Sequence, residues 1–174
     1  YDYFSLEERS YLVLEFINGK DLEMIIEETE GFMAEEQVLV WAIELCDVLS
    51  FLHTHKPDPI IFRDMKPSNV MINQSQHVML VDFGIAKPFQ AGQKGTMIGT
   101  EGYSPPEQYR GEATPLADVY ALGATLHHAL TRRNPQLEPP FSFSERPVRK
   151  INPVISPEIE SVITTALQYN PEDR

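Results

Sequence analysis

The sequence of 174 residues contains a single cysteine, Cys46, so no disulfide can form within the chain, and a reducing compartment such as the cytoplasm is expected. Only 14 lysines and arginines stand against 26 acidic residues. The formal net charge of −12 argues against the basic face that nucleic acid or an anionic membrane surface requires. No apolar run approaches the roughly 20 residues of a membrane span, although the sequence is compatible with a tether outside this segment. We therefore expect a cytoplasmic domain with no nucleic-acid partner.

What the sequence does contain is the composition of a globular domain, with 42% hydrophobic and 23% charged residues. Apolar residues at helical spacing, together with capping signals, predict four helices: 21–28, 35–53, 115–130 and one that starts at 156–157. Runs of β-branched and aromatic residues predict strands at 11–17, 70–72 and 78–81. The apolar neighbours of Cys46 predict that its thiol packs in the core.

Two short motifs carry chemistry. The first is the run Phe-Arg-Asp-Met-Lys-Pro-Ser-Asn at 62–69, in which Asp64 can accept or orient a hydroxyl proton. Lys66 can offset charge on a phosphate that is being transferred. The second motif is Asp82-Phe83-Gly84, thirteen residues after Asn69. These two motifs, in this order and flanked by strand signals, indicate phosphoryl transfer.

The same motifs supply metal ligands. Asn69 and Asp82 offer the hard oxygen atoms that suit Mg²⁺, and Gly84 lets the backbone turn directly after the aspartate. The long segment 82–107 that follows has little periodicity, and loops of this length are usually functional or disordered. The histidines at 53, 55, 127 and 128 match no zinc spacing.

These motifs resemble those of serine/threonine protein kinases of the bacterial eukaryotic-like type. The run at 99–107 resembles the end of the family's activation segment, and 118–123 resembles the start of its central buried helix. The resemblance implies a mainly α-helical fold: the large C-terminal lobe at 18–174, with short β-hairpins at the catalytic loop. Residues 1–17 would be a strand remnant of the small lobe and hinge.

The resemblance also implies roles for individual residues near the catalytic loop. Thr100 would contact Asp64 and Lys66 and favour serine or threonine substrates. Glu107 would pair with Arg174. The buried Asp118 would accept hydrogen bonds from the backbone of the catalytic loop, since a buried carboxylate needs such partners.

A nucleotide site is implied at the start of the chain. Leu14 would be the gatekeeper, and the Glu15 carbonyl and Ile17 amide would face adenine. Asp21 would face the ribose, and Met71 would pack beneath the adenine ring. Plain core packing is the alternative for Leu14 and Met71.

Regulation is implied by Arg63, which in the family binds a phosphate on the activation loop. By spacing the acceptor would be Thr96. The alternative is that Arg63 pairs with a nearby carboxylate in this acidic chain.

The sequence departs from the family at two points. Phe62 stands where the family usually has histidine. Phenylalanine keeps the packing of a ring but loses the hydrogen bonds of the imidazole. The 174 residues also contain no glycine-rich loop, no lysine strand and no partner glutamate helix. We therefore expect an ATP- and Mg²⁺-dependent (or Mn²⁺-dependent) kinase of protein serine and threonine residues, whose small lobe lies elsewhere in the parent chain. This segment should be inactive alone and should self-associate through the strand edge at 11–17.

Two alternatives stay open. A pseudokinase or phospho-signalling binding module would use the same fold without catalysis. A small-molecule phosphotransferase of the kinase-like superfamily would share the aspartates, but that group lacks the segment 100–107 and the motif at Asp118.

Overall fold

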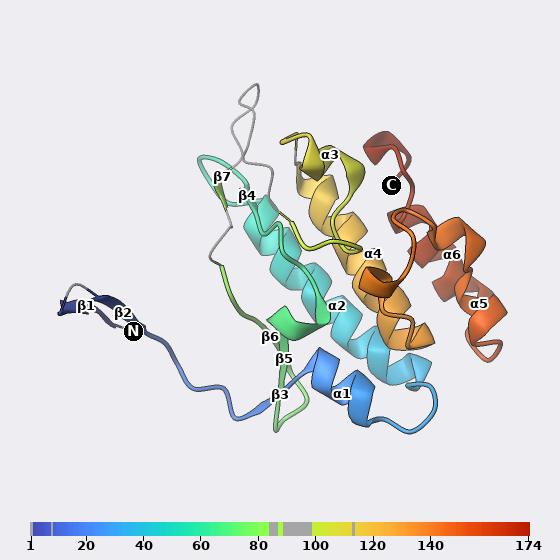
Figure 1. The fold of residues 1–174 in the computed structure, drawn as a ribbon, viewed down its shortest axis with the longest axis horizontal. Coiled ribbons are helices and arrows are strands. Elements are labelled where there is room, and N and C mark those ends of the chain that lie inside the picture. Colours follow the sequence, from blue (N-terminus) through green and yellow to red (C-terminus); the bar gives the residue numbers. More distant parts are fainter. Residues whose placement is uncertain (1, 8, 84–86, 89–98, 113) are drawn as a thin grey trace.

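The computed structural model describes residues 2–7, 9–83, 87–88, 99–112 and 114–174, with the backbone alone at 87–88. Figure 1 shows a helical body and, at the start of the chain, a two-stranded hairpin that stands away from it. Gly84 and Thr96 lie outside the described residues.

The four expected helices are present: α1 (Leu22–Glu28), α2 (Glu35–His53), α4 (Pro115–Thr131) and α6 (Pro157–Ala166). Two single-turn helices, α3 (Pro106–Tyr109) and α5 (Val148–Ile151), accompany them. Short 3₁₀ turns η1 to η4 cover Pro67–Asn69, Pro135–Leu137, Phe143–Glu145 and Pro171–Asp173. No helix within the described ranges is both long and apolar enough to cross a bilayer.

The helix starts follow from local chemistry. The carboxylate of Asp21 accepts a hydrogen bond from the Met24 amide at 2.8 Å and so caps α1. Thr114 and Ser156 cap α4 and α6 in the same way, and each is followed by a proline, whose missing N–H costs nothing in the first turn.

The core lies between α2, α4 and the strands. The expected stripe on α2 is buried throughout: Val38, Trp41, Ala42, Leu45, Leu49 and Leu52. Helix α4 is buried on nearly all sides, which fits its apolar sequence and makes it the central element of the body. The ribbons of α2, α4 and α6 run side by side in Figure 1.

A small antiparallel sheet supports the catalytic loop. Its strand order is β3 (Gly19–Asp21), β5 (Val70–Asn73) and β6 (Val78–Leu80), so the predicted hairpin at 70–81 is confirmed. Strand β4 (Ile60–Ile61) pairs with β7 (Lys87–Pro88). The catalytic segment 62–69 therefore runs between β4 and β5, with a strand at each end to hold it.

The N-terminal strand differs from the prediction. Strands β1 (Asp2–Leu6) and β2 (Arg9–Val13) form an antiparallel hairpin whose ten side chains are all exposed. Only the first part of the predicted strand at 11–17 is in β2, because the ladder ends at the pair of Asp2 with Val13. The residues after it run to β3 without regular structure; Leu14 and Phe16 among them are exposed, and Ile17 is half-buried.

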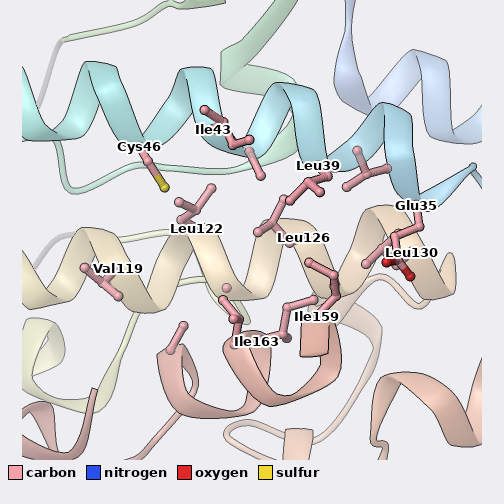
Figure 2. A pocket seen from close by; sticks show the side chains of 15 residues that line it. Glu35, Leu39, Ile43, Cys46, Val119, Leu122, Leu126, Leu130, Ile159 and Ile163 are labelled. Carbon is pink, nitrogen blue, oxygen red and sulfur yellow. The ribbon is translucent and has the colours of Figure 1, made fainter. Parts of the chain in front are cut away.

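An apolar pocket of about 210 Å³ lies where α2, α4 and α6 meet. Figure 2 shows Glu35 at one end of it, Cys46 at the other, and Leu122 and Leu126 of α4 between them. The prediction that Cys46 packs in the core is wrong, because the thiol is exposed. The buried stripe of α2 runs through Leu45, which leaves the next residue on the helix edge. Partial burial in the pocket and, secondly, the charge of Asp47 raise the pKa of this thiol, so it stays protonated.

Candidate active site

Asp64, Lys66 and Thr100 meet at the catalytic loop. The Thr100 hydroxyl donates to Asp64 Oδ1 at 2.6 Å, and Lys66 Nζ donates to the same hydroxyl oxygen at 3.0 Å. Lys66 Nζ also lies 2.9 Å from Asp64 Oδ2. The three groups close a ring of hydrogen bonds between residues 36 positions apart in the chain, which is the contact that the family resemblance implied.

Asn69 also supports the carboxylate of Asp64. Its Nδ2 donates to the backbone oxygen of Asp64 at 2.8 Å and to Asp64 Oδ2 at 2.9 Å. Both carboxylate oxygens of Asp64 therefore accept hydrogen bonds, and one of them also lies beside the Lys66 ammonium group, so the side chain is fixed in position. The carbonyl oxygen of the Asn69 amide is then the atom left to act as a metal ligand.

Asp82 lies two residues after the end of β6, and the amide of its neighbour Val81 donates a backbone hydrogen bond, 2.9 Å long, to the Asn69 oxygen, which joins the two segments. Asp82 has a positive φ of 63°, so the backbone turns sharply at this residue. Two oxygen ligands suit Mg²⁺, which is bound by one or two protein groups plus substrate phosphates. Within the described ranges, no group of three or more histidine, cysteine or acidic side chains could hold a metal by itself.

The two motifs also touch through their aromatic residues. The Phe62 ring is fully buried and meets the Phe83 ring edge-to-face, with the centroids 5.1 Å apart. This contact gives a physical reason why phenylalanine is tolerated at position 62, because the site uses the ring for packing.

Asp118 binds the backbone of the loop at 62–69. It is completely buried, and its two oxygens accept hydrogen bonds from the backbone amides of Phe62, at 2.9 Å, and Arg63, at 2.8 Å. His53 Nε2 lies 2.7 Å from Asp118 Oδ2, so the C-terminal end of α2 joins the same network. This role of His53 was not predicted from the sequence, because a single histidine at a helix end forms no recognisable motif.

Arg63 is held by its backbone. It has φ of 71°, its amide donates to Asp118, and its carbonyl oxygen accepts from Gln108 Nε2 at 2.8 Å. The side chain is 8% exposed, and within the described part of the chain its Nε has no hydrogen-bond partner and its guanidinium pairs with no carboxylate. The alternative pairing with a carboxylate is therefore not seen among the described residues, and Thr96, the predicted phosphate acceptor, lies outside them.

The far end of the activation segment is fixed by Glu107 and Arg174. Arg174 Nη1 bonds Glu107 Oε1, and Nη2 donates to Oε2 at 3.1 Å, in a buried two-point pair. Nη1 also donates to the Leu116 oxygen at 3.1 Å, and the guanidinium carbon lies 4.8 Å from the Tyr120 ring centroid. The pair joins α3 to the C-terminal turn, which lie near each other in Figure 1.

The buried histidines on α4 each have their own partner. The Tyr103 hydroxyl and His128 Nδ1 are 2.7 Å apart, and His127 Nε2 lies 2.8 Å from the Arg146 oxygen. Burial lowers the pKa of both histidines to about 4, and for His128 the charge of its neighbour contributes secondly. Both are therefore neutral near pH 7, and His128 ties the segment after Thr100 to α4.

The structure brings together only part of the predicted nucleotide site. Asp21 and Met71 face each other in the β3–β5 ladder. One oxygen of Asp21 already caps α1, so the ribose would share this carboxylate with the helix. Leu14 and Glu15 are exposed and Ile17 is half-buried, all three in the irregular segment between β2 and β3.

The loop holds a carboxylate, an ammonium and a hydroxyl together, with Asn69 and Asp82 as candidate metal ligands, an arrangement that suits phosphoryl transfer. The profile of the family described as "Protein kinase domain" matches residues 1–174, and the chain belongs to this family. The fold is accordingly a protein-kinase-like one, mainly helical with a few short strands.

Three relatives illustrate the likeness. The serine/threonine-protein kinase PknB of Mycolicibacterium smegmatis is 35% identical over 179 residues, which cover 94% of this chain and 28% of that protein. The PknB of Mycobacterium leprae is 35% identical over 178 residues, with the same coverage of both chains. The serine/threonine-protein kinase AtPK1/AtPK6 of Arabidopsis thaliana is 34% identical over 176 residues, 98% of this chain and 37% of that protein. The chain thus spans between 28% and 37% of the length of these relatives.

Proposed function

We propose that this chain binds and activates the acceptor hydroxyl in the ATP-dependent transfer of a phosphoryl group to serine and threonine residues of proteins. The observation that carries the proposal is the ring of hydrogen bonds between Asp64, Lys66 and Thr100, supported by Asn69. The likeness to serine/threonine kinases at about 35% identity supports the same substrate class.

The reaction follows from the contacts. A substrate hydroxyl placed at Asp64 gives its proton to the carboxylate as its oxygen attacks the γ-phosphorus of ATP, and ADP leaves from the opposite side. Lys66, 2.9 Å from that carboxylate, offsets negative charge that develops on the transferring group. Asn69 and Asp82 would hold Mg²⁺, which when bound neutralises the charge of the phosphates.

Lobe assignment is part of the proposal. Residues 18–174 serve as the large lobe, and residues 1–17 belong to the small lobe and hinge, with Leu14, Glu15 and Ile17 beside the adenine. A small lobe supplies the glycine-rich cover and the lysine of the nucleotide cleft. The single cysteine and the net charge of −12 support a cytoplasmic location.

Self-association is a further part of the proposal. Leu12, Leu14 and Phe16 are each more than 60% exposed, and the outer edge of β2 is available for pairing with another chain. Two copies of this chain would pair through the segment 11–17.

The test uses the full-length protein that carries these residues, and measures radiolabelled phosphate transfer from ATP to protein serine and threonine. Asp64→Ala and Asp82→Ala should each abolish transfer and leave the circular dichroism spectrum unchanged. Ser68→Ala, in the same loop and outside these hydrogen bonds, is the matched control and should keep activity. Nucleotide binding without transfer in the unsubstituted protein would instead indicate a pseudokinase.

A further inference from the structure

Gln108 is a buried polar residue of α3 that the proposed reaction does not use. Its side chain is 3% exposed, and its Nε2 donates to the backbone oxygen of Arg63 at 2.8 Å and to Ser104 Oγ at 3.2 Å. A neutral amide supplies two N–H donors in one plane without the cost of burying a charge. The two bonds reach different parts of the site, and each has a consequence for Asp64.

The first bond fixes the peptide unit that leads into Asp64. The Arg63 oxygen belongs to the rigid plane that joins Arg63 to Asp64, so a bond to this oxygen sets the direction in which the Asp64 Cα lies. The Arg63 amide is held separately, by Asp118 at 2.8 Å. The backbone is therefore bonded on both sides of the Arg63 Cα by side chains that belong to two different helices.

The backbone conformation of Arg63 depends on being held from both sides. Its φ of 71° lies in the left-handed region, which costs free energy for a residue with a Cβ. Such a conformation persists only where the surrounding structure determines it from several directions. Without Gln108, the peptide unit after Arg63 would be free to rotate about the Arg63 ψ angle. That rotation would move Asp64 directly, because Asp64 is the next residue.

The second bond places the same amide beside the segment that carries Thr100. Ser104 belongs to the turn after Thr100, since its amide donates to the Thr100 oxygen at 3.1 Å. Gly99 packs closely here as well: a Cβ at this position would overlap Ser104 Oγ and lie 2.8 Å from Gln108 Nε2. The Thr100 hydroxyl in turn donates to Asp64 Oδ1 at 2.6 Å. Gln108 therefore bonds both segments that meet at the Asp64 carboxylate.

Helix α3 is a fixed support for this amide. Glu107, the residue before Gln108, forms the buried two-point pair with Arg174. One residue of the single helical turn is thus attached to the C-terminal turn of the chain, and the next is attached to the catalytic loop. The amide of Gln108 is held in place by contacts that do not involve the loop it bonds.

We propose that Gln108 is a positioning residue for phosphoryl transfer: its buried amide sets the orientation of the peptide unit between Arg63 and Asp64 and aligns it with the segment that carries Thr100. Its bonds are made to protein atoms, so it acts through Asp64. The proposal rests on the proposed function, because the position of Asp64 affects the rate only if Asp64 takes part in the transfer.

Turnover of the full-length protein that carries these residues tests the proposal. Gln108→Met keeps an unbranched side chain of similar length and loses both donors, so kcat on a serine peptide should fall roughly 10–100-fold, as expected for a displaced catalytic group. The KM for the peptide should change less than about twofold, because Gln108 is buried and offers the peptide no surface. Gln108→Glu keeps the shape, replaces the donors by acceptors and should lower kcat at least as much. An unchanged kcat in both variants, or a loss confined to KM, would overturn the proposal.

A matched control separates positioning from a general loss of stability. Asn152 is fully buried, and its Nδ2 donates to the Leu130 oxygen at 2.8 Å, near the opposite end of α4 from Asp118. Asn152→Leu removes the same kind of bond, so it should lower the urea midpoint as Gln108→Met does and leave kcat within about twofold. Ser104→Ala removes only the second acceptor and should lower kcat less than about threefold. A kcat that follows the urea midpoint across these variants would make the role of Gln108 purely structural and contradict the proposal.

Hydrogen exchange provides a readout that does not require catalysis. In the full-length protein, the amides of 62–66 should exchange roughly tenfold faster in Gln108→Met, because local opening of the loop costs less free energy, and at an unchanged rate in Asn152→Leu. Equal exchange in Gln108→Met and the unsubstituted protein would contradict the positioning role. Faster exchange in Gln108→Met, together with no phosphate transfer by the unsubstituted protein, would contradict the proposed function alone.

Discussion

The catalytic loop and the N-terminal hairpin are both short segments next to strands, yet the rest of the molecule holds them very differently. In the loop at 62–69, Phe62 and Met65 are buried, and the backbone is bonded by Asp118 from one side and Gln108 from the other. In the hairpin at 2–13, the described side chains of both strands are exposed, and its internal contacts beyond the ladder include one stacked ring pair and a hydrogen bond from the Tyr3 hydroxyl to Ser10.

This difference separates the contacts that fix where a segment lies in the molecule from the contacts that fix only the segment's own shape. Ladder hydrogen bonds and the stack of Phe4 on Tyr11 are enough to make a hairpin, but they do not attach it to the body. The loop has little regular structure of its own, and its shape comes from a buried carboxylate and a buried amide that belong to distant helices. Changes at these supports should therefore cost far more stability than changes in the hairpin.

The largest effect is expected at Asp118. Asp118→Ala leaves the amides of Phe62 and Arg63 and the His53 ring without their buried acceptor, and it should lower the free energy of unfolding by about 3–5 kcal/mol. Urea unfolding of the chain measures this loss. Asp118→Asn keeps one acceptor oxygen and should lose less. Equal and small losses in the two variants would mean that the loop is held by something else.

Acid should have the next largest effect, through the histidines of α4. Burial lowers the pKa of His127 and His128 to about 4, whereas in the unfolded chain they titrate near 6.5. The unfolded state therefore binds protons first, and stability is lost as the pH falls from about 6.5 towards 4. At pH 5 the loss is roughly 2 kcal/mol for each histidine.

The measurement is urea unfolding between pH 7 and 5. His128→Gln, which can still accept from Tyr103, should make the pH dependence shallower, whereas His55→Gln, at an exposed position, should leave it unchanged. The same slope in both variants would remove His128 from the acid response.

A moderate effect is expected at the pair of Arg174 and Glu107. Arg174→Lys keeps the charge and loses the two-point geometry, so it should lower the unfolding free energy by about 1–3 kcal/mol. Chemical denaturation provides the value. Arg132→Lys, at an exposed arginine that bonds only backbone oxygens, is the comparison and should lose less.

The smallest effect on stability is expected in the hairpin. Leu12→Lys combined with Leu14→Lys should change the unfolding free energy by less than about 0.5 kcal/mol, since both side chains are exposed. The same double substitution should abolish self-association in light scattering. An unsubstituted chain that stays monomeric at high concentration would rule out pairing through residues 11–17.

The sequence predicts structure where local contacts decide it, and predicts less where contacts with distant residues do. Helices α2, α4 and α6 were predictable because apolar spacing and the caps Thr114 and Ser156 agree with each other. The meeting of Thr100 with Asp64 came from the likeness of two motifs, since no local pattern joins residues 36 positions apart. Strand formation at 14–17 was predicted wrongly, because residue type indicates a strand whether or not a neighbour is there to pair with it.

Other features had no signal in the sequence. His53 reaches Asp118 only through the crossing of α2 and α4, and the exposure of Cys46 depends on which edge of α2 faces the pocket. The ring contacts among Tyr109, Phe141 and Tyr169 join three segments, and the positive φ of Phe141 cannot be predicted from its residue type.

The rate of phosphate transfer by Asp64→Asn tests the central claim most directly. The substitution keeps the size of the side chain and removes the carboxylate, the proposed proton acceptor, that Lys66, Thr100 and Asn69 surround. In the full-length protein that carries these residues, transfer to a serine substrate should fall at least about 100-fold, the share that a positioned general base contributes. A rate within threefold of the unsubstituted protein would contradict the role of this loop in phosphoryl transfer.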